Sequence, residues 1–124
     1  MSGWDAYCAY FNGFAESAAI VSKDGALCGK FGSWGATQQD MSGYAQICKD
    51  IEHGGQLPLT YKGVKYIINR CADDTCFGMK GKEGLVLQKT ATLIVVAHVN
   101  EKYAPNLAAG KCDQVAKLLK DAGL

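Results

Sequence analysis

The chain has 124 residues, 48% of them hydrophobic, which is enough for one compact core, so we expect a single domain over residues 1–124. Thirteen basic and twelve acidic residues give a formal net charge of +1, which gives no reason to expect nucleic acid as a partner. No stretch approaches the roughly 20 apolar residues of a membrane span, and no signal-peptide layout opens the chain, so we expect a soluble, cytoplasmic protein without a transmembrane segment.

Aromatic residues recur at helical spacing near the N-terminus. Trp4, Tyr7, Phe11 and Phe14 follow one another at steps of three or four residues. This spacing predicts an amphipathic helix, with Ser2 as its N-cap and the two phenylalanines in the core.

The next segment, "SAAIVSKDGALCGKF", carries a Lys-Asp-Gly turn between two apolar runs and predicts a hairpin with strands at 18–22 and 26–31. Thr37 and Asp40 then open a stretch whose apolar residues keep helical spacing as far as Ile51. We expect that helix to end at His53-Gly54-Gly55.

Between Leu57 and Val99 the pattern changes to β-branched and aromatic runs separated by short turns, which predicts an antiparallel meander. The last run, "TLIVVAHV", is apolar throughout and predicts a central strand covered on both faces. A C-terminal helix follows, with Gly123 as its cap and an apolar face formed by Leu107, Val115, Leu118 and Leu119. Terminal helices and a sheet together indicate an α+β layer arrangement.

Six cysteines would fit a disulfide framework in a secreted domain, but nothing in the sequence marks secretion. Cys8, Cys28, Cys48 and Cys112 each lie among apolar neighbours and are expected to be reduced and buried. The stretch "RCADDTCF" is different, because two strand ends around an Asp-Asp turn bring Cys71 and Cys76 opposite one another and allow a reversible disulfide.

Metal, cofactor and catalytic chemistry find little support in the sequence. A zinc site needs about four ligands, and beyond the cysteines only His53 and His98 are available, so we expect no metal and no cofactor. The stretch "GMKGKEG" lacks the ending of a phosphate-binding P-loop and favours a glycine-rich hairpin with solvated lysines. No local motif pairs a cysteine with a histidine, so we do not expect an enzyme.

Several strings, taken in order, resemble profilins, the small actin-monomer-binding proteins. "GWDAY" is similar to the family's Trp-x-x-Tyr opening, and "AAIVSKDG" to its first hairpin. "GVKYIINR" and "FGMKGKEGLVLQKT" resemble its glycine- and lysine-bearing strands, and "VNEKYAPNLAAGKCDQVAKLLKDAGL" its last strand, proline turn and C-terminal helix. The resemblance runs nearly end to end.

The resemblance implies an antiparallel sheet of six or seven strands, with the terminal helices packed on one face and shorter helices on the other. It also implies binding of monomeric actin through late strands and the start of the last helix. Proline-rich segments would bind between the terminal helices, where aromatic faces stack on a preformed polyproline II helix. Phosphoinositides would compete at basic positions.

The family's proline groove corresponds here to Trp4, Tyr7, Cys28, Leu118 and Leu119. Cys28 and Leu118 stand where the family usually has aromatic residues, and losing a stacking ring costs about 1 kcal/mol. The resemblance therefore implies weakened polyproline binding, unless Trp34 or Tyr10 supplies a ring.

The actin-binding positions implied by the resemblance are Arg70, Lys80, Lys82, Lys89 and Asp113, and Met79 replaces one lysine of the family's "GKKG" turn. Arg70, Lys80 and Lys82 would also form the phosphoinositide patch. Each charge could equally be an ordinary solvated side chain.

Three hypotheses remain at this point. The first is an actin-monomer-binding protein that regulates filament assembly, and the second is an adaptor or scaffold with the same fold but another partner. The third is a thiol enzyme that pairs a cysteine with His98.

Overall fold

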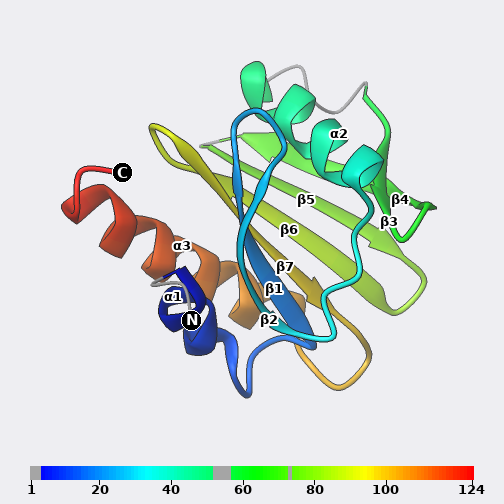
Figure 1. The fold of residues 1–124 in the computed structure, drawn as a ribbon. Helices are drawn as coiled ribbons and strands as arrows, with labels where there is room; N and C mark the ends of the chain where they lie inside the picture. Colours follow the sequence, from blue (N-terminus) through cyan, green and yellow to red (C-terminus); the bar gives the residue numbers. More distant parts are fainter. Residues whose placement is uncertain (1–3, 52–56, 73) are drawn as a thin grey trace.

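The computed structural model describes residues 4–51, 57–72 and 74–124. Seven strands form one antiparallel sheet in the order β2-β1-β7-β6-β5-β4-β3 (Figure 1). The strands are β1 (Ser17–Ser22), β2 (Leu27–Gly32), β3 (Leu59–Tyr61), β4 (Val64–Ala72), β5 (Thr75–Lys80), β6 (Glu83–Lys89) and β7 (Leu93–Val99). The predicted hairpin, the meander and the α+β class are confirmed.

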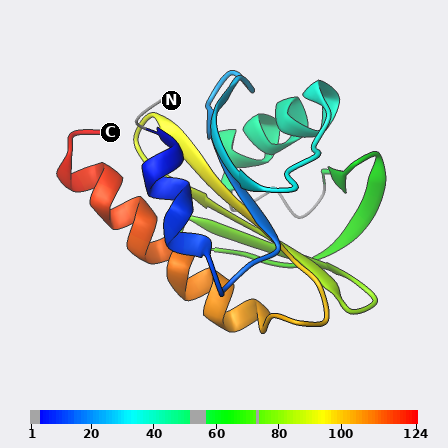
Figure 2. The same cartoon turned by 60° about the horizontal axis from the view of Figure 1, so that its bottom comes forward.

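Helices cover both faces of the sheet. The N-terminal helix α1 (Trp4–Cys8), with a short 3-10 turn η1 (Ala9–Phe11), lies beside the C-terminal helix α3 (Pro105–Asp121) on one face (Figure 2). The helix α2 (Gln38–Lys49) covers the opposite face (Figure 1). We call these the α3 face and the α2 face. Nowhere in the described ranges is a helix long and apolar enough to cross a membrane.

The strand β7 lies at the centre of the sheet, between β1 and β6, and all seven of its residues are buried. Alternate side chains enter two separate clusters, because successive residues of a strand point to opposite faces. Val95, Ala97 and Val99 pack under α3, whereas Ile94 and Val96 pack under α2. The expectation of a central strand covered on both sides is confirmed.

The N-terminal helix is shorter than its aromatic spacing predicts. α1 ends at Cys8, a 3-10 turn follows, and Gly13 then adopts φ +85°, a left-handed conformation that ends helical structure. Phe11 is in the core as predicted, but Phe14 is only half-buried, with its ring 4.4 Å from the Lys111 Nζ atom. The proposed N-cap, Ser2, lies outside the described residues, as does the expected helix end at His53.

The C-terminal helix follows its predicted pattern except at one position. Val115 and Leu119 are buried against the sheet, and Gly123 has φ +84° just beyond the helix end, as a C-terminal cap requires. The prediction that Leu107 belongs to the same apolar face is wrong, because Leu107 is 56% exposed. It lies in the first turn of the helix, where the core side is instead occupied by Ala108.

The expectation of buried thiols is confirmed for three of the four single cysteines and is wrong for Cys28. Cys8, Cys48 and Cys112 are buried thiols, and Cys28 is half-buried. Cys71 and Cys76 face one another in the β4–β5 register and are joined by a disulfide. The pair lies on the α2 face, where Cys76 belongs to the core.

A buried carboxylate joins the start of α2 to the β3–β4 hairpin. The Asp40 carboxylate accepts hydrogen bonds from the Thr37 amide (2.9 Å) and the Thr60 hydroxyl (2.6 Å), and the Gly63 amide lies 3.4 Å away. The Thr37 hydroxyl in turn accepts from the Asp40 amide (3.0 Å), completing a capping box. Burial alone would raise the pKa of Asp40, but these hydrogen bonds outweigh it and hold the pKa below its ordinary value.

Replacing Asp40 with Asn is expected to lower the free energy of unfolding by about 2 kcal/mol at neutral pH, because the amide cannot accept all of these hydrogen bonds. A carboxyl with a depressed native pKa stabilises the fold above its unfolded pKa of about 4 and loses that contribution as the pH falls. Urea denaturation from pH 7 down to pH 3 should therefore show the difference between the wild type and the variant shrinking at the acidic end. Equal free energies of unfolding for the wild type and the Asp40→Asn variant at pH 7 would show that the Asp40 charge does not stabilise the fold.

Candidate functional site

The terminal helices form a shallow pocket of about 610 Å³, lined by Ala6, Tyr7, Tyr10 and Leu118. We call it the terminal-helix pocket. Tyr7 comes from α1, Tyr10 from the 3-10 turn and Leu118 from the last turns of α3. Tyr10 is 45% exposed, so an aromatic ring is available to a ligand.

Trp4 stands next to this pocket, with its ring 6.3 Å from that of Tyr7. A close approach at Gly29 and one hydrogen bond hold α1 against β2. Gly29 leaves room for the helix, since a Cβ there would lie 2.5 Å from the Cβ of Trp4. The Asp5 carboxylate also accepts a hydrogen bond from the Lys30 amide (3.0 Å). The rings of Trp4 and Tyr7 are half-buried, so each packs on the core and keeps some surface exposed.

The other residues predicted for the proline groove divide into two groups. Cys28, like Trp4 and Tyr7, packs against the core of the α3 face, and Leu118 lines the pocket. Leu119 is fully buried and cannot contact a ligand in this conformation, which corrects its assignment. Trp34 cannot replace the missing ring either, because it packs against Tyr61 in the core of the α2 face.

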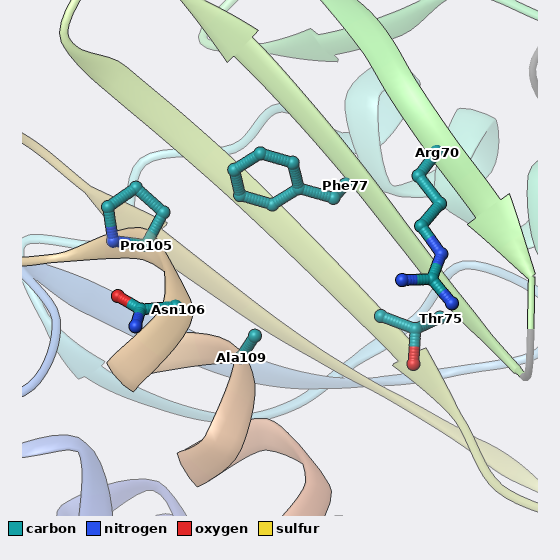
Figure 3. Close-up of a pocket in the computed structure, with 6 residues that line it drawn as sticks. All are labelled: Arg70, Thr75, Phe77, Pro105, Asn106 and Ala109. Carbon is teal, nitrogen blue, oxygen red and sulfur yellow. The ribbon is translucent and has the colours of Figure 1, made fainter.

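A second pocket, of about 490 Å³, opens on the α3 face and is mostly apolar (Figure 3). We call it the strand–helix pocket. Arg70, Thr75 and Phe77 line it from β4 and β5, and Pro105, Asn106 and Ala109 line it from the start of α3.

A β-bulge turns Arg70 toward this pocket. Ile67 pairs with Met79, but Arg70 pairs with Phe77, so one extra residue lies between them on β4. Without that residue, the alternation of side chains would place Arg70 on the α2 face. The bulge therefore places the Arg70 side chain on the α3 face, where Arg70 and its strand partner Phe77 both line the pocket.

The surface next to the strand–helix pocket carries further polar and apolar groups. Asp113 is exposed one turn beyond Ala109 on α3, so the two share a helix face. Lys82 forms an ion pair with Glu101 (3.5 Å), and both line a neighbouring hollow together with Met79, Tyr103 and Pro105. Ile67 is 71% exposed on the same face of β4.

Two of the predicted actin-binding lysines lie on the other face. Strand alternation places Lys80 and Lys89 on the α2 face, where Lys89 forms an ion pair with Asp74 (3.8 Å). The structure thus brings Arg70, Lys82 and Asp113 to one surface and separates them from Lys80 and Lys89. For the same reason, Arg70, Lys80 and Lys82 do not form one basic patch.

The arrangement does not support a cysteine–histidine nucleophile. Burial raises the pKa of the Cys8 thiol to about 12 and that of Cys48 to about 11, and it also raises the pKa of Cys112 and Cys28. These thiols are poor nucleophiles, because the thiolate is the reactive form. The ring nitrogens of His98 lie 3.0–3.2 Å from side-chain oxygens of Glu16, Glu83 and Tyr66.

Thr75, Phe77 and Pro105 were missed by the sequence reasoning. The sequence-based prediction for this surface named only charged residues, although apolar residues supply most of the pocket wall. The alternation of β5 carried a usable signal, since it places Thr75, Phe77 and Met79 on one face.

Comparisons with known proteins identify the family to which this fold belongs. The profilin family model matches residues 2–124. A profilin-1B of Acanthamoeba castellanii is 31% identical over 114 residues, covering 90% of this chain and 88% of the relative. A profilin structure from Schizosaccharomyces pombe superimposes with a TM-score of 0.88 at 27% identity, covering 98% of this chain and all of that one.

Two more distant structures share the fold and contain partners. One is a complex of LokiProfilin1 with rabbit actin (TM-score 0.75, 22% identity, 92% of this chain and 90% of that one). The other is mouse profilin IIa with a double repeat from the FH1 domain of mDia1 (TM-score 0.76, 20% identity, 99% and 100% covered). The family match over nearly the whole chain and the identity to its curated members lead to one conclusion: the chain belongs to the profilin family.

Proposed function

We propose that this protein binds monomeric actin and regulates the assembly of actin filaments, acting in the cytoplasm as a single profilin-like domain over residues 1–124. Membership of the profilin family supports a binding protein over an enzyme. The LokiProfilin1 complex with rabbit actin has the same fold, which supports actin as the partner. An adaptor with a different partner is not favoured.

The observation that carries the proposal is the strand–helix pocket. Its wall is formed by a half-buried aromatic ring, Phe77, together with Pro105 and Ala109, and a cation, Arg70, stands at its side. Protein interfaces take most of their affinity from such aromatic and arginine residues in desolvated pockets, surrounded by a polar rim. Asp113 and the Lys82–Glu101 pair supply that rim. We assign actin binding to this surface and not to the α2 face.

Filament assembly from purified actin tests the proposal. An excess of this protein over actin should slow spontaneous assembly, in a concentration-dependent way, because a bound monomer has one side covered. An unchanged assembly rate in the presence of folded protein would argue for the adaptor instead.

We propose a second ligand, a proline-rich segment, for the terminal-helix pocket. The support is the exposed ring of Tyr10 beside Tyr7, and the mouse profilin IIa complex with an FH1 repeat. Tyr10 supplies an aromatic ring to the groove, whereas Cys28 and Leu118 have no ring to supply. A polyproline II helix is extended before it binds, so a few rings suffice for weak affinity.

Replacing Tyr10 with Ala is expected to weaken binding of a decaproline peptide about fivefold or more, corresponding to the loss of one stacking ring of about 1 kcal/mol. Tryptophan fluorescence can follow the titration, because Trp4 lies beside the pocket whereas Trp34 is buried on the far side of the sheet. The matched control is Tyr103→Ala. It also removes a partly exposed tyrosine, but Tyr103 lies near the start of α3, outside the terminal-helix pocket, so decaproline affinity should not change. Equal affinity of the Tyr10 variant and the wild type would remove this residue from the groove.

A further inference from the structure

A histidine and two glutamates meet at the end of the sheet where β7 finishes and β6 begins. His98 is only 3% exposed on β7. Its Nδ1 atom lies 3.0 Å from the Glu16 Oε2 atom, and its Nε2 atom lies 3.2 Å from the Glu83 Oε1 atom. One potential ligand atom from each residue lies within 4.8 Å of the other two. Neither proposed ligand pocket uses this cluster.

The three side chains of the cluster bring two carboxylates and, while the imidazole is neutral, no positive charge of their own, although Lys62 acts on His98 from nearby and Lys80 pairs with Glu83 across the strands. A neutral imidazole has one N–H donor and one lone pair. The Nε2 atom lies 3.1 Å from the Tyr66 hydroxyl, but the Nδ1 atom is buried and makes no hydrogen bond. A carboxylate oxygen only 3.0 Å from that unsatisfied nitrogen is favourable when a cation lies between or beside them.

The donor atoms suit zinc. Imidazole nitrogen and carboxylate oxygen bind Zn²⁺ at about 2.0–2.2 Å, which places tetrahedral ligand atoms roughly 3.3 Å apart. The distance between the Nδ1 atom and the Glu16 Oε2 atom, 3.0 Å, is close to that separation. The side chain of Glu83 is half exposed, so an ion can reach the cluster from solvent.

We propose that His98, Glu16 and Glu83 bind one divalent transition-metal ion of the zinc class, with water completing the coordination. The ion takes the Nδ1 atom, because a metal binds only one ring nitrogen and Nε2 has the Tyr66 hydroxyl as a partner. Glu16 is the second ligand, and the exposed Glu83 side chain turns from Nε2 to become the third.

The surrounding contacts hold the proposed ligands in place, as the neighbours of metal ligands commonly do. The Tyr61 ring stacks on the imidazole with its centroid 4.4 Å away. The Asn100 side-chain amide lies 3.3 Å from the Glu16 Oε2 atom, and the Ser33 hydroxyl lies 3.4 Å from its Oε1 atom. Both the ring and the carboxylate therefore have a fixed orientation.

Calorimetric titration of the full chain with zinc chloride, in a buffer that does not chelate, tests the site. The Cys28→Ser variant is used throughout as the background, because it removes a half-buried thiol that could bind zinc. We expect one ion per chain, and at least tenfold weaker binding after Glu83→Gln or Glu16→Gln. Glu101→Gln is the matched control, since Glu101 is an exposed carboxylate paired with Lys82, and it should leave zinc binding unchanged.

Imidazole NMR identifies the ligand directly, because the chain has only two histidines. Zinc should shift the ring signals of His98, and His53→Gln assigns them by removing the other set. Glu83 is half exposed, so its variant is expected to fold, and thermal unfolding without metal confirms this. Cobalt(II) should give the visible absorption of a nitrogen and oxygen site without a thiolate charge-transfer band.

The proposal is overturned if the His98 signals respond to pH but not to zinc, which would show that the cluster holds a proton only. It is also overturned if Glu101→Gln weakens zinc binding as much as Glu83→Gln does. Either result leaves the actin proposal unaffected, because Arg70 and the strand–helix pocket do not include these ligands.

Discussion

Arg70→Glu is expected to weaken binding to monomeric actin at least tenfold while the protein stays folded. The bulge on β4 places the Arg70 guanidinium beside the strand–helix pocket, where reversing its charge would oppose any acidic group on the partner. A few central hot-spot residues, among which arginine is enriched, each cost about 2 kcal/mol or more when they are lost, and about 1.4 kcal/mol is a tenfold change in affinity. Arg70 is exposed, so stability should change little.

Lys80→Glu is the matched control for that experiment. It reverses the same charge on the neighbouring strand, but Lys80 is exposed on the α2 face. Its affinity for actin should stay within about threefold of the wild type, because exposed charges away from an interface contribute little. If Lys80→Glu proved as damaging as Arg70→Glu, or if both were harmless, actin would not bind where we have placed it.

Leu119→Ala is expected to lower the free energy of unfolding by about 3 kcal/mol, which is typical of a large-to-small change in a close-packed core. Leu119 is fully buried with Val115 and Ala116 between α3 and the sheet. Urea denaturation followed by circular dichroism measures the change. Affinity for decaproline, measured where the variant remains folded, should be nearly that of the wild type.

Leu118, the residue before Leu119, is expected to affect ligand binding more than stability. Leu118 is half-buried and lines the terminal-helix pocket, so Leu118→Ala should cost about 1 kcal/mol or less in stability but weaken decaproline binding. Equal losses of stability in the two variants would contradict the assignment of Leu119 to the core and Leu118 to the pocket.

Patterns within one element were enough to predict the strands and α2. The β-branched runs and their tight turns marked β3 to β7, and the Thr37–Asp40 pair marked the start of α2. Such signals depend on residues a few positions apart, and those residues stay neighbours in any fold that keeps the element. The extent of α1 was harder to predict, because a 3-10 turn continues the aromatic spacing without continuing the helix.

The face on which each charge lies depended on features that the sequence does not mark. One bulged residue before Arg70 decides that it shares a face with Phe77, and strand alternation sends Lys80 to the other side. The resemblance to profilins indicated which charges to consider, and the register then divided them between two surfaces.

The His98 cluster was the feature least accessible from the sequence. Glu16 and Glu83 are far from His98 along the chain, and they meet only because β1 and β6 flank β7. Cysteines and histidines at short spacing mark a metal site in a sequence, whereas carboxylates brought together by a sheet have no such spacing.

Sedimentation velocity of purified monomeric actin with this protein tests the central proposal most directly. We expect a complex of one protein and one actin, formed in proportion to the protein added and strongly reduced by Arg70→Glu. The absence of any complex at roughly tens of micromolar protein, near the weak end of specific affinities, would contradict actin binding by this chain.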